Sequence, residues 1–204
     1  MTTPRTYSRT SPGKYSLWLD FETSGADFDS GETFKKYQGI SFGAVIADNE
    51  TLEEVDSLYC EMKFDPVYTW TEGAEKIHGL SREYLAEHGM DRDDALTLLL
   101  ELITKYIGAG NKVCIGGHNV EFDIRALNQL TEDVVEKGFT IPIHHVKLET
   151  SGAAFIAIGK YRSDDVFTFF GGAERQAHNA LDDARLALAS ARGIKQLVQA
   201  ALGE

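Results

Sequence analysis

The sequence predicts an α/β fold in which helices flank a mixed β-sheet. Three observations favour it: short apolar runs of strand length open the chain, segments of helical period follow them, and further short apolar runs then alternate with helices. Elements that alternate in this way pack as layers around one core. A chain of 204 residues is long enough for one well-packed domain and short for two.

The predicted strands are short apolar runs bounded by polar or glycine-containing segments. A polar turn at residues 48–50 joins the second and third of them, and the polar, glycine-containing segment 26–38 is predicted to be a loop or insertion. The predicted strands are Tyr15–Phe21, Ile40–Ala47, Val55–Phe64, Lys112–Gly116 and Ile143–Leu148.

The predicted helices range from single short turns to one long helix that closes the chain. Residues 1–13 are rich in Ser, Thr, Pro and Arg and are predicted to form a flexible tail, which leaves 14–204 as the single folded domain. The predicted helices are Glu72–His78, Ser81–Glu87, Asp91–Ile107, Val120–Leu130, Ser151–Ile158 and Ala180–Leu202.

Composition narrows the class of protein. The net charge of −12 argues against a protein that clamps long duplex DNA, because such proteins usually neutralise phosphates with a basic face. No apolar run of membrane-spanning length occurs, and the first residues lack the apolar core of a secretory signal, so we expect a cytoplasmic protein without a membrane partner. Cys60 and Cys114 lie in apolar segments and are predicted to be buried free thiols.

The first candidate site is the strand segment that contains Asp20 and Glu22. Alternate residues of a strand share a face, so the two carboxylates point the same way. Adjacent carboxylates repel each other unless a positive charge lies between them, and their hard oxygens suit Mg²⁺ or Mn²⁺. The alternative is a strand end that emerges into solvent, where acidic residues are common.

The second candidate site follows a Gly-Gly turn at the start of the fourth predicted helix. Asn119 is a plausible N-cap there, and Asp123 falls in the first turns of that helix. The alternative for Asp123 is an acid that stabilises the positive end of the helix dipole. Glu121 is a rival carboxylate, which we expect to be solvated because it lies between Val120 and Phe122.

The third candidate site is at the start of the last helix. One stripe of that helix carries small and aliphatic residues at 180, 184, 187, 191, 194 and 198. Asp183 lies about 60° from the centre of this stripe and Asp182 about 160° away, which makes Asp183 the inward acid. His178 precedes the helix and is placed to reach over the site, although a cap or surface role is the ordinary alternative.

The segments DFET, HNVEFD and HNALDDA, in this order, resemble the three motifs of the DEDDh family of 3′–5′ exonucleases. That family includes the proofreading epsilon subunit of bacterial replicases, ribonuclease T and oligoribonuclease. The resemblance covers about residues 15–198, and Ile77–Leu80 is similar to a further short segment of these enzymes. Two departures are Glu149, where many members have Asp before Thr, and the 26–38 segment, which is longer than the usual connection.

The resemblance implies a ribonuclease H-like fold and hydrolysis assisted by two Mg²⁺ ions, for which Mn²⁺ can substitute. It assigns Asp20, Glu22 and Asp183 to one ion, and Asp20 with Asp123 to the second. His178 is the implied general base, because an unperturbed imidazole titrates near neutral pH. The implied reaction releases nucleoside 5′-monophosphates from single-stranded 3′ ends.

Substrate contacts follow less directly from the sequence. Backbone N–H groups at Thr23 and Ser24 are predicted to hold the terminal 3′-hydroxyl. His78, Asn119 and Phe122 are predicted to touch the substrate, with a structural role, helix capping and core packing as their respective alternatives. Single-stranded DNA is slightly favoured over RNA as substrate, and a homodimer or a replication protein is a conceivable partner.

Two other functions are compatible with parts of the sequence. The first is a non-catalytic nucleic-acid-binding or polymerase-associated scaffold domain of the same fold, which would be expected to have lost at least one acid. The second is a metal-dependent phosphatase or nucleotidase, which would need a closed pocket for a small substrate. All four acids and the histidine are present, which favours the exonuclease.

Overall fold

A computed structural model describes residues 12–27, 32–135, 140–172 and 178–203, so most of the predicted N-terminal tail lies outside the described residues. Five strands form one sheet in the order β3-β2-β1-β4-β5. The central strand β1 pairs with β2 in antiparallel and with β4 in parallel orientation, which confirms the predicted mixed sheet. The strands are β1 (Tyr15–Thr23), β2 (Gly39–Asp48), β3 (Glu54–Glu61), β4 (Ile115–Gly117) and β5 (Leu148–Glu149).

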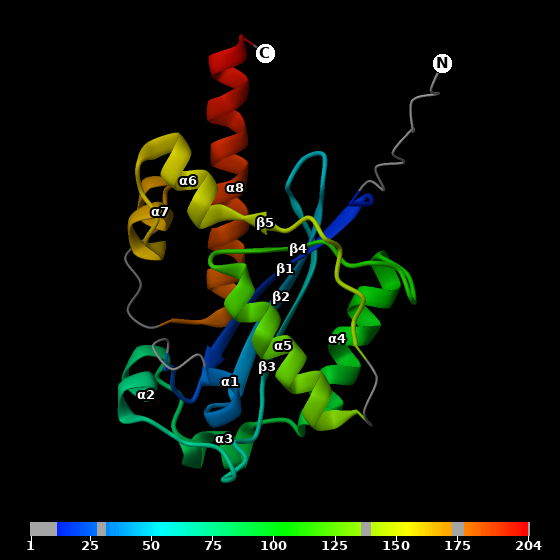
Figure 1. Cartoon of the computed structure of the whole chain (residues 1–204), viewed down its shortest axis with the longest axis vertical. Helices are drawn as coiled ribbons and strands as arrows, with labels where there is room; N and C mark the ends of the chain where they lie inside the picture. Colours follow the sequence, from blue (N-terminus) through cyan, green and yellow to red (C-terminus); the bar gives the residue numbers. More distant parts are fainter. Residues whose placement is uncertain (1–11, 28–31, 136–139, 173–177, 204) are drawn as a thin grey trace, which may run out of the picture.

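Helices cover both faces of this sheet. Figure 1 shows α8 with α6 and α7 on one side and α4 with α5 on the other. Within the described part of the chain, no helix is both long and apolar enough to cross a membrane. The helices are α1 (Thr33–Lys36), α2 (Glu72–His78), α3 (Arg82–His88), α4 (Arg92–Tyr106), α5 (Val120–Val134), α6 (Thr150–Ile158), α7 (Ser163–Phe169) and α8 (Ala180–Leu202).

The alternation of residues along β1 divides the core into two layers. Leu17, Leu19 and Phe21 point to the face covered by α4 and α5 and join the larger apolar cluster. Trp18 points to the opposite face, where it packs in a cluster with alanines of α8. Because the side-chain period of a strand is two, the next residues on the α8 face are Asp20 and Glu22.

Two predictions of secondary structure need correction, one for a loop and one for a strand. Segment 26–38 is not wholly a loop, because it contains α1, whose Thr33 is buried. The predicted strand 143–148 is mostly irregular. Ile143 forms an isolated bridge with Val113, and the backbone N–H of Val146 donates to His144 Nδ1 within its own segment. Only residues 148–149 pair as a strand.

The helix α7 was not predicted from the sequence. It has seven residues, and only Val166 and Phe167 of it are buried. Both residues are buried on the α8 face of the sheet, where they join the cluster around Trp18.

Candidate active site

The three candidate segments converge where β1 ends and α8 begins. One ligand atom each from Glu22, His178 and Asp183 lies within 4.8 Å of the others, which makes these residues a group able to hold a metal ion. Glu22 and Asp183 are 9% and 4% exposed. Asp20 is half-buried on the same face of β1 as Glu22. Buried acids so close together require a compensating positive charge.

A glycine in the neighbouring strand brings α8 to this position. Gly43 of β2 lies opposite Asp20 in the sheet, and a Cβ atom placed on it would lie 2.2 Å from the backbone N and Cα of Leu181. The helix therefore touches the sheet at a point that only glycine leaves open. Gly43 was not among the predicted site residues, although a lone glycine within an apolar strand indicates a close backbone approach.

The first turn of α8 orients its two adjacent acids differently. The Asn179 side chain caps the helix by accepting hydrogen bonds from the backbone N–H groups of Leu181 and Asp182. Asp183 turns inward and is buried, whereas the Asp182 side chain is 69% exposed and lies 3.9 Å from Arg185. The helix phase predicted from the sequence is confirmed for both acids.

His178 lies just before α8 and borders the acids. Its backbone N–H donates to the carbonyl of Ile77 at 3.0 Å, which ties this segment to the last turn of α2. Its Nδ1 atom lies 3.5 Å from Asp183 Oδ2, and its side chain remains 37% exposed. The imidazole is therefore in contact with a buried carboxylate and open to solvent at the same time.

Asp123 approaches β1 from the other helix layer. It lies in the first turns of α5, is only 2% exposed, and its Oδ1 atom accepts a hydrogen bond from the backbone N–H of Phe21 at 2.9 Å. Burial raises the pKa of the Asp123 carboxyl well above its usual range, and the carboxylates of Glu149 and Glu22 add to this effect. The Phe21 N–H opposes the shift. In such surroundings a nearby cation would stabilise the charged form of the carboxyl group.

Asn119 does not cap α5 as predicted. It is in the left-handed conformation with φ of 61°, its side chain makes no capping bond, and it is exposed. The Glu149 carboxylate caps the helix instead, because it accepts from the backbone N–H groups of Asn119 at 3.0 Å and Val120 at 2.9 Å. The same carboxylate accepts from Ser151 N–H at the start of α6. Glu149, the residue that departs from the family pattern, therefore links the starts of α5 and α6.

The end of β1 is held by backbone bonds that the sequence did not reveal. The Ser24 N–H donates to the Gln38 carbonyl, and the Ser24 hydroxyl donates to the Thr69 carbonyl while accepting from Gln38 N–H. The Thr23 hydroxyl donates to the Gly25 carbonyl. These bonds occupy the Ser24 N–H that was predicted to hold a 3′-hydroxyl, so that contact is not available in this structure.

His78 and Phe122 have different surroundings. His78 is 5% exposed, its Nδ1 accepts from the backbone N–H of Leu80, and its ring packs edge-on against Trp70. Burial lowers the pKa of His78 to about 4, so the ring is neutral at physiological pH. These contacts favour the structural role for His78. Phe122 is half-buried and contacts Phe34 of α1, with ring centroids 4.9 Å apart.

Comparison with known proteins gives the family. The profile of the exonuclease family RNase_T matches residues 17–190. Among curated protein sequences, none matches the chain significantly.

Solved structures share the fold. Exonuclease I of E. coli, in a zinc-bound complex with single-stranded DNA, superposes with a TM-score of 0.71 at 18% identity, over 90% of this chain and 41% of that one. A 3′-exonuclease that recognises the histone mRNA stem-loop gives 0.70 at 14% identity, over 90% and 82%. The nuclease domain of 3′hExo, a DEDDh family member bound to rAMP, gives 0.68 at 16% identity, over 90% and 92%.

The chain thus spans about two fifths of exonuclease I and nearly all of the 3′hExo nuclease domain. The likeness confirms the predicted ribonuclease H-like arrangement of a mixed sheet between helices. Since the family profile covers most of the described chain, the protein belongs to the exonuclease family, as its DEDDh motifs predicted.

Proposed function

We propose that this protein is a metal-dependent 3′–5′ exonuclease that releases nucleoside 5′-monophosphates from single-stranded 3′ ends. The observation that carries the proposal is the convergence of Glu22, Asp183 and His178 at the end of β1. Asp20 shares their face of the sheet, and Asp123 reaches the same strand from α5. This grouping joins acids from three distant parts of a chain that belongs to the exonuclease family.

A site for divalent cations is the role that best fits these acids. Three of them are almost fully buried, and a cation between them would offset their mutual repulsion. Asp20, Glu22 and Asp183 are the proposed ligands of one ion, and Asp20 with Asp123 the ligands of a second. Hard oxygen ligands suit Mg²⁺, with Mn²⁺ as a substitute. Such ions supply the positive charge that stabilises the attacking and leaving oxygens of a phosphodiester.

His178 is the proposed general base. Its side chain is open to solvent, so a water molecule can reach it, and its other side faces the Asp183 carboxylate. When the imidazole accepts a proton from water, the nearby carboxylate stabilises the positive charge that results. An imidazole nitrogen in this group could also ligate a softer ion such as Zn²⁺, and replacement of His178 separates the two roles.

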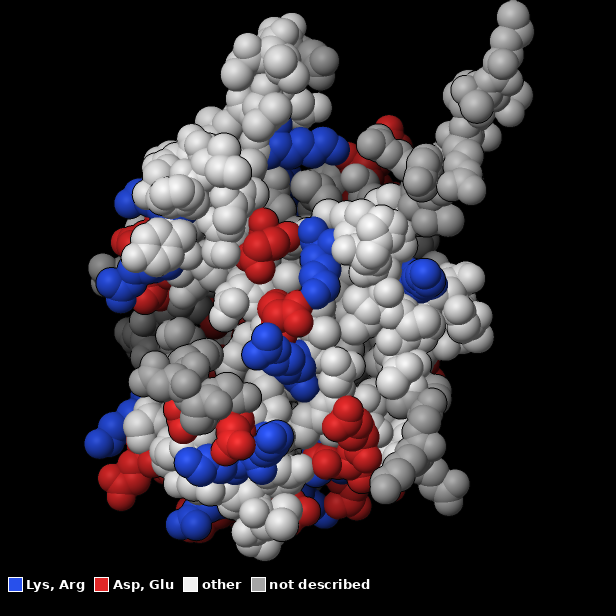
Figure 2. Space-filling view, viewed as in Figure 1, with Lys and Arg blue, Asp and Glu red and all other residues white. Residues whose placement is uncertain are grey.

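Proteins of this fold act on both DNA and RNA: exonuclease I is seen with single-stranded DNA and a 3′-exonuclease with a histone mRNA stem-loop, and similarity of fold does not separate the two. We propose single-stranded DNA as the favoured substrate, and the assay below compares it with RNA. On the face shown in Figure 2, the described residues mix both signs of charge and form no broad basic area, which suits a short footprint on one strand.

An oligonucleotide assay tests the proposal. Strands of single-stranded DNA, duplex DNA and RNA labelled at the 5′ end are incubated with Mg²⁺, with Mn²⁺ or with EDTA. We expect a ladder that shortens from the 3′ end, activity lost in EDTA, and the highest rate on single-stranded DNA. Loss of the 5′ label as a mononucleotide at early times would contradict the direction, and binding without cleavage would favour a scaffold domain.

Variants of two neighbouring acids sharpen the assay. Asp183→Asn should lower kcat/KM by at least about 10²-fold, because it removes a group that acts on charge in the transition state. Asp182→Asn is the matched control, since that side chain is exposed one position away, and its activity should stay near wild type.

A variant of the histidine tests the proposed base. His178→Gln should lower kcat while Mg²⁺-dependent stabilisation against heat persists, because a base is not needed for ion binding. Loss of that stabilisation would instead make His178 a ligand.

A further inference from the structure

A cavity of about 490 Å³ lies at the start of β1, at the other end of this strand from the carboxylates. The segment before β1, the last turn of α4 and the segment that leads into β4 surround it (Figure 1). Tyr15 and Glu22 are seven residues apart in β1, so about 23 Å separate the cavity from the proposed active site. Its volume is in the range of small-molecule sites, and the proposed reaction does not use it.

The lining of this cavity is basic, although the chain carries a net charge of −12. Lys14 and Lys112 line it, and none of its described lining residues is an Asp or a Glu. Within the described part of the chain, Lys112 forms no ion pair. Two cations with no acid in the same wall favour an anionic ligand, because the lining itself does not neutralise them.

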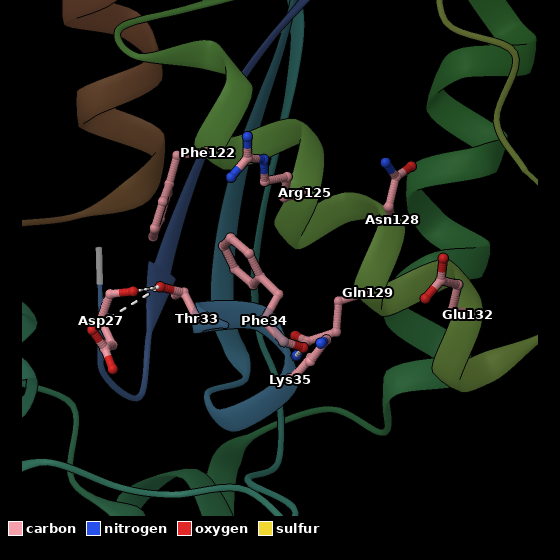
Figure 3. Close-up of a pocket in the computed structure, with 9 residues that line it drawn as sticks. All are labelled: Asp27, Thr33, Phe34, Lys35, Phe122, Arg125, Asn128, Gln129 and Glu132. Carbon is pink, nitrogen blue, oxygen red and sulfur yellow. Dashed lines mark hydrogen bonds between the residues drawn. The ribbon is translucent and has the colours of Figure 1, made fainter. Parts of the chain in front are cut away.

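A second cavity shows the contrast. It lies between Phe34 of α1 and Phe122 of α5 and has a volume of about 270 Å³. Figure 3 shows Asp27 and Glu132 among the residues of its wall. The absence of acids from the wall at the start of β1 is therefore not shared by this other cavity.

The pairing of β1 with β4 brings the two lysines to one place. Leu17 and Ile115 are partners in the parallel ladder, and Lys14 and Lys112 each precede their partner residue by three positions. Both lysines therefore lie at the same edge of the sheet. The backbone N–H of Asn49 donates to the Lys14 carbonyl at 2.9 Å, which ties the first segment to the turn after β2.

Two tyrosines form an aromatic wall beside the lysines. Tyr15 and Tyr106 are half-buried, and their rings meet edge-on with centroids 5.6 Å apart. The Tyr106 hydroxyl donates to Asp56 at 2.9 Å, which holds the second ring in place. Asn111 also lines the cavity, and its amide can hydrogen-bond the edge of a planar ligand. Aromatic rings that stack on a base, next to cations that attract its phosphate, are the means by which proteins bind nucleotides.

We propose that this cavity binds a free nucleoside monophosphate, with the base against the two tyrosines and the phosphate at Lys14 and Lys112. An inorganic anion would use the lysines alone, whereas a nucleoside monophosphate uses both parts of the wall. The reaction proposed above releases such a molecule, but the binding does not depend on that reaction, because the cavity lies at the opposite end of β1.

Acidic residues beside the cavity favour one nucleotide over a strand. The pKa of Lys14 is raised first by its contact with Tyr15 and then by the carboxylates of Asp48 and Glu50. Asp56 is the partner of the second tyrosine. These carboxylates would repel the further phosphates of an oligonucleotide that extends beyond the cavity. A ligand with a single phosphate avoids this repulsion.

Calorimetric titration of the whole protein tests the site. EDTA is present throughout, so that no metal ion draws a phosphate to the carboxylates of the active site. We expect AMP to bind at least about 10-fold more tightly than adenosine or inorganic phosphate, because only AMP contacts both the lysines and the rings. Lys14→Glu combined with Lys112→Glu should weaken AMP binding by at least about 10-fold, since charge-assisted hydrogen bonds to the phosphate are lost.

The matched control makes the same change of charge elsewhere. Lys35→Glu combined with Lys76→Glu alters two exposed lysines of α1 and α2, and AMP affinity should stay within about 2-fold of wild type because salt screens distant charges. An equal loss of AMP affinity in this control would overturn the site, since net charge alone would then explain the effect.

Variants of one tyrosine test whether the base is bound. Tyr106→Leu should weaken AMP binding by about 5-fold or more, the effect of losing a stacking ring, and leave phosphate binding unchanged. Tyr106→Phe keeps the ring and should retain wild-type AMP affinity. The lysine variants change exposed side chains, so they keep the proposal testable if Tyr106→Leu does not fold.

Three results would overturn the proposal. AMP affinity could be unchanged in the lysine variant, phosphate could bind as tightly as AMP, or a 5′-phosphorylated tetranucleotide could bind more tightly than AMP. The last result would make the cavity part of a path for a strand. A wild-type protein that cleaves no oligonucleotide with Mg²⁺ would overturn the proposed function and leave this binding site untouched.

Discussion

The two helices that bring acids to β1 are positioned in different ways. The helix α8 is placed by neighbours in its own sequence and by one glycine: Asn179 caps it, a stripe of alanines faces the sheet, and Gly43 lets its backbone touch β2. The helix α5 begins at Val120, receives no side-chain cap from Asn119, and depends on Glu149, which lies 30 residues after Asn119. The first turn is thus capped locally in α8 and from a distant residue in α5.

The largest effect is expected where α8 meets the sheet. Gly43→Ala places a methyl group 2.2 Å from the Leu181 backbone, which cannot yield as a side chain can. Displacement of the helix should lower the unfolding free energy by about 1–3 kcal/mol, as overpacking does. It should also lower kcat/KM by about 10²-fold, because Asp183 and His178 move together away from β1.

The control for that variant is Gly152→Ala in α6, where no atom of the described residues outside its own turn of helix lies within 4 Å of the added methyl group. It should stabilise the protein slightly, since alanine favours helix over glycine. Denaturant titration and the oligonucleotide assay measure both variants. Wild-type activity and stability in Gly43→Ala would show that contact with the sheet does not position α8.

An effect confined to acid pH is expected at His78, whose α2 neighbour Ile77 accepts the His178 N–H. The pKa of His78 is lowered to about 4 by burial, from an ordinary value near 6.5. Above pH 6.5 the ring is neutral in both states and contributes no pH dependence. As pH falls from 6.5 toward 4, the unfolded chain binds a proton that the folded protein does not, so stability is lost.

By about pH 4.5 this loss should amount to about 2–3 kcal/mol, because one pKa unit corresponds to about 1.4 kcal/mol. His78→Asn retains an acceptor for the Leu80 N–H and removes the titration. Urea unfolding at pH 7 and pH 4.5 should therefore show a smaller drop in the variant than in the wild type. An equal drop in both proteins would mean that His78 is protonated in the folded state.

The smallest effect is expected at the cap of α5. Glu149→Ala removes the acceptor for three backbone N–H groups and should lower the unfolding free energy by about 1–2 kcal/mol. Asn179→Ala at α8 is the matched comparison and should cost about 1 kcal/mol. Glu149→Asp, which restores the residue common in the family, should fall between Glu149→Ala and the wild type. A neutral Glu149→Ala would show that α5 is held by packing alone.

Regular patterns made most of the fold predictable. Apolar runs placed β1, β2 and β3 within a few residues of their observed bounds, and helical period did the same for α4, α5 and α8. Among the short helices, α2 and α3 were predicted, whereas α1 and α7 were not and are held by contacts with other helices. The strand expected at 143–148 failed because apolar residues there make one bridge instead of a ladder.

The sequence by itself determined which acids can meet. Strand alternation put Asp20 and Glu22 on one face, and helix phase turned Asp183 inward and Asp182 outward, because both depend only on local geometry. The family motifs, not periodicity, pointed to Asp123 and His178.

Only the tertiary structure decided how those residues are held. The 2.2 Å approach at Gly43, the Glu149 cap on α5, the engaged Ser24 N–H and the cavity between Phe34 and Phe122 all join segments far apart in the chain. Such contacts depend on the distance and direction between elements, and a linear pattern of residue types carries neither.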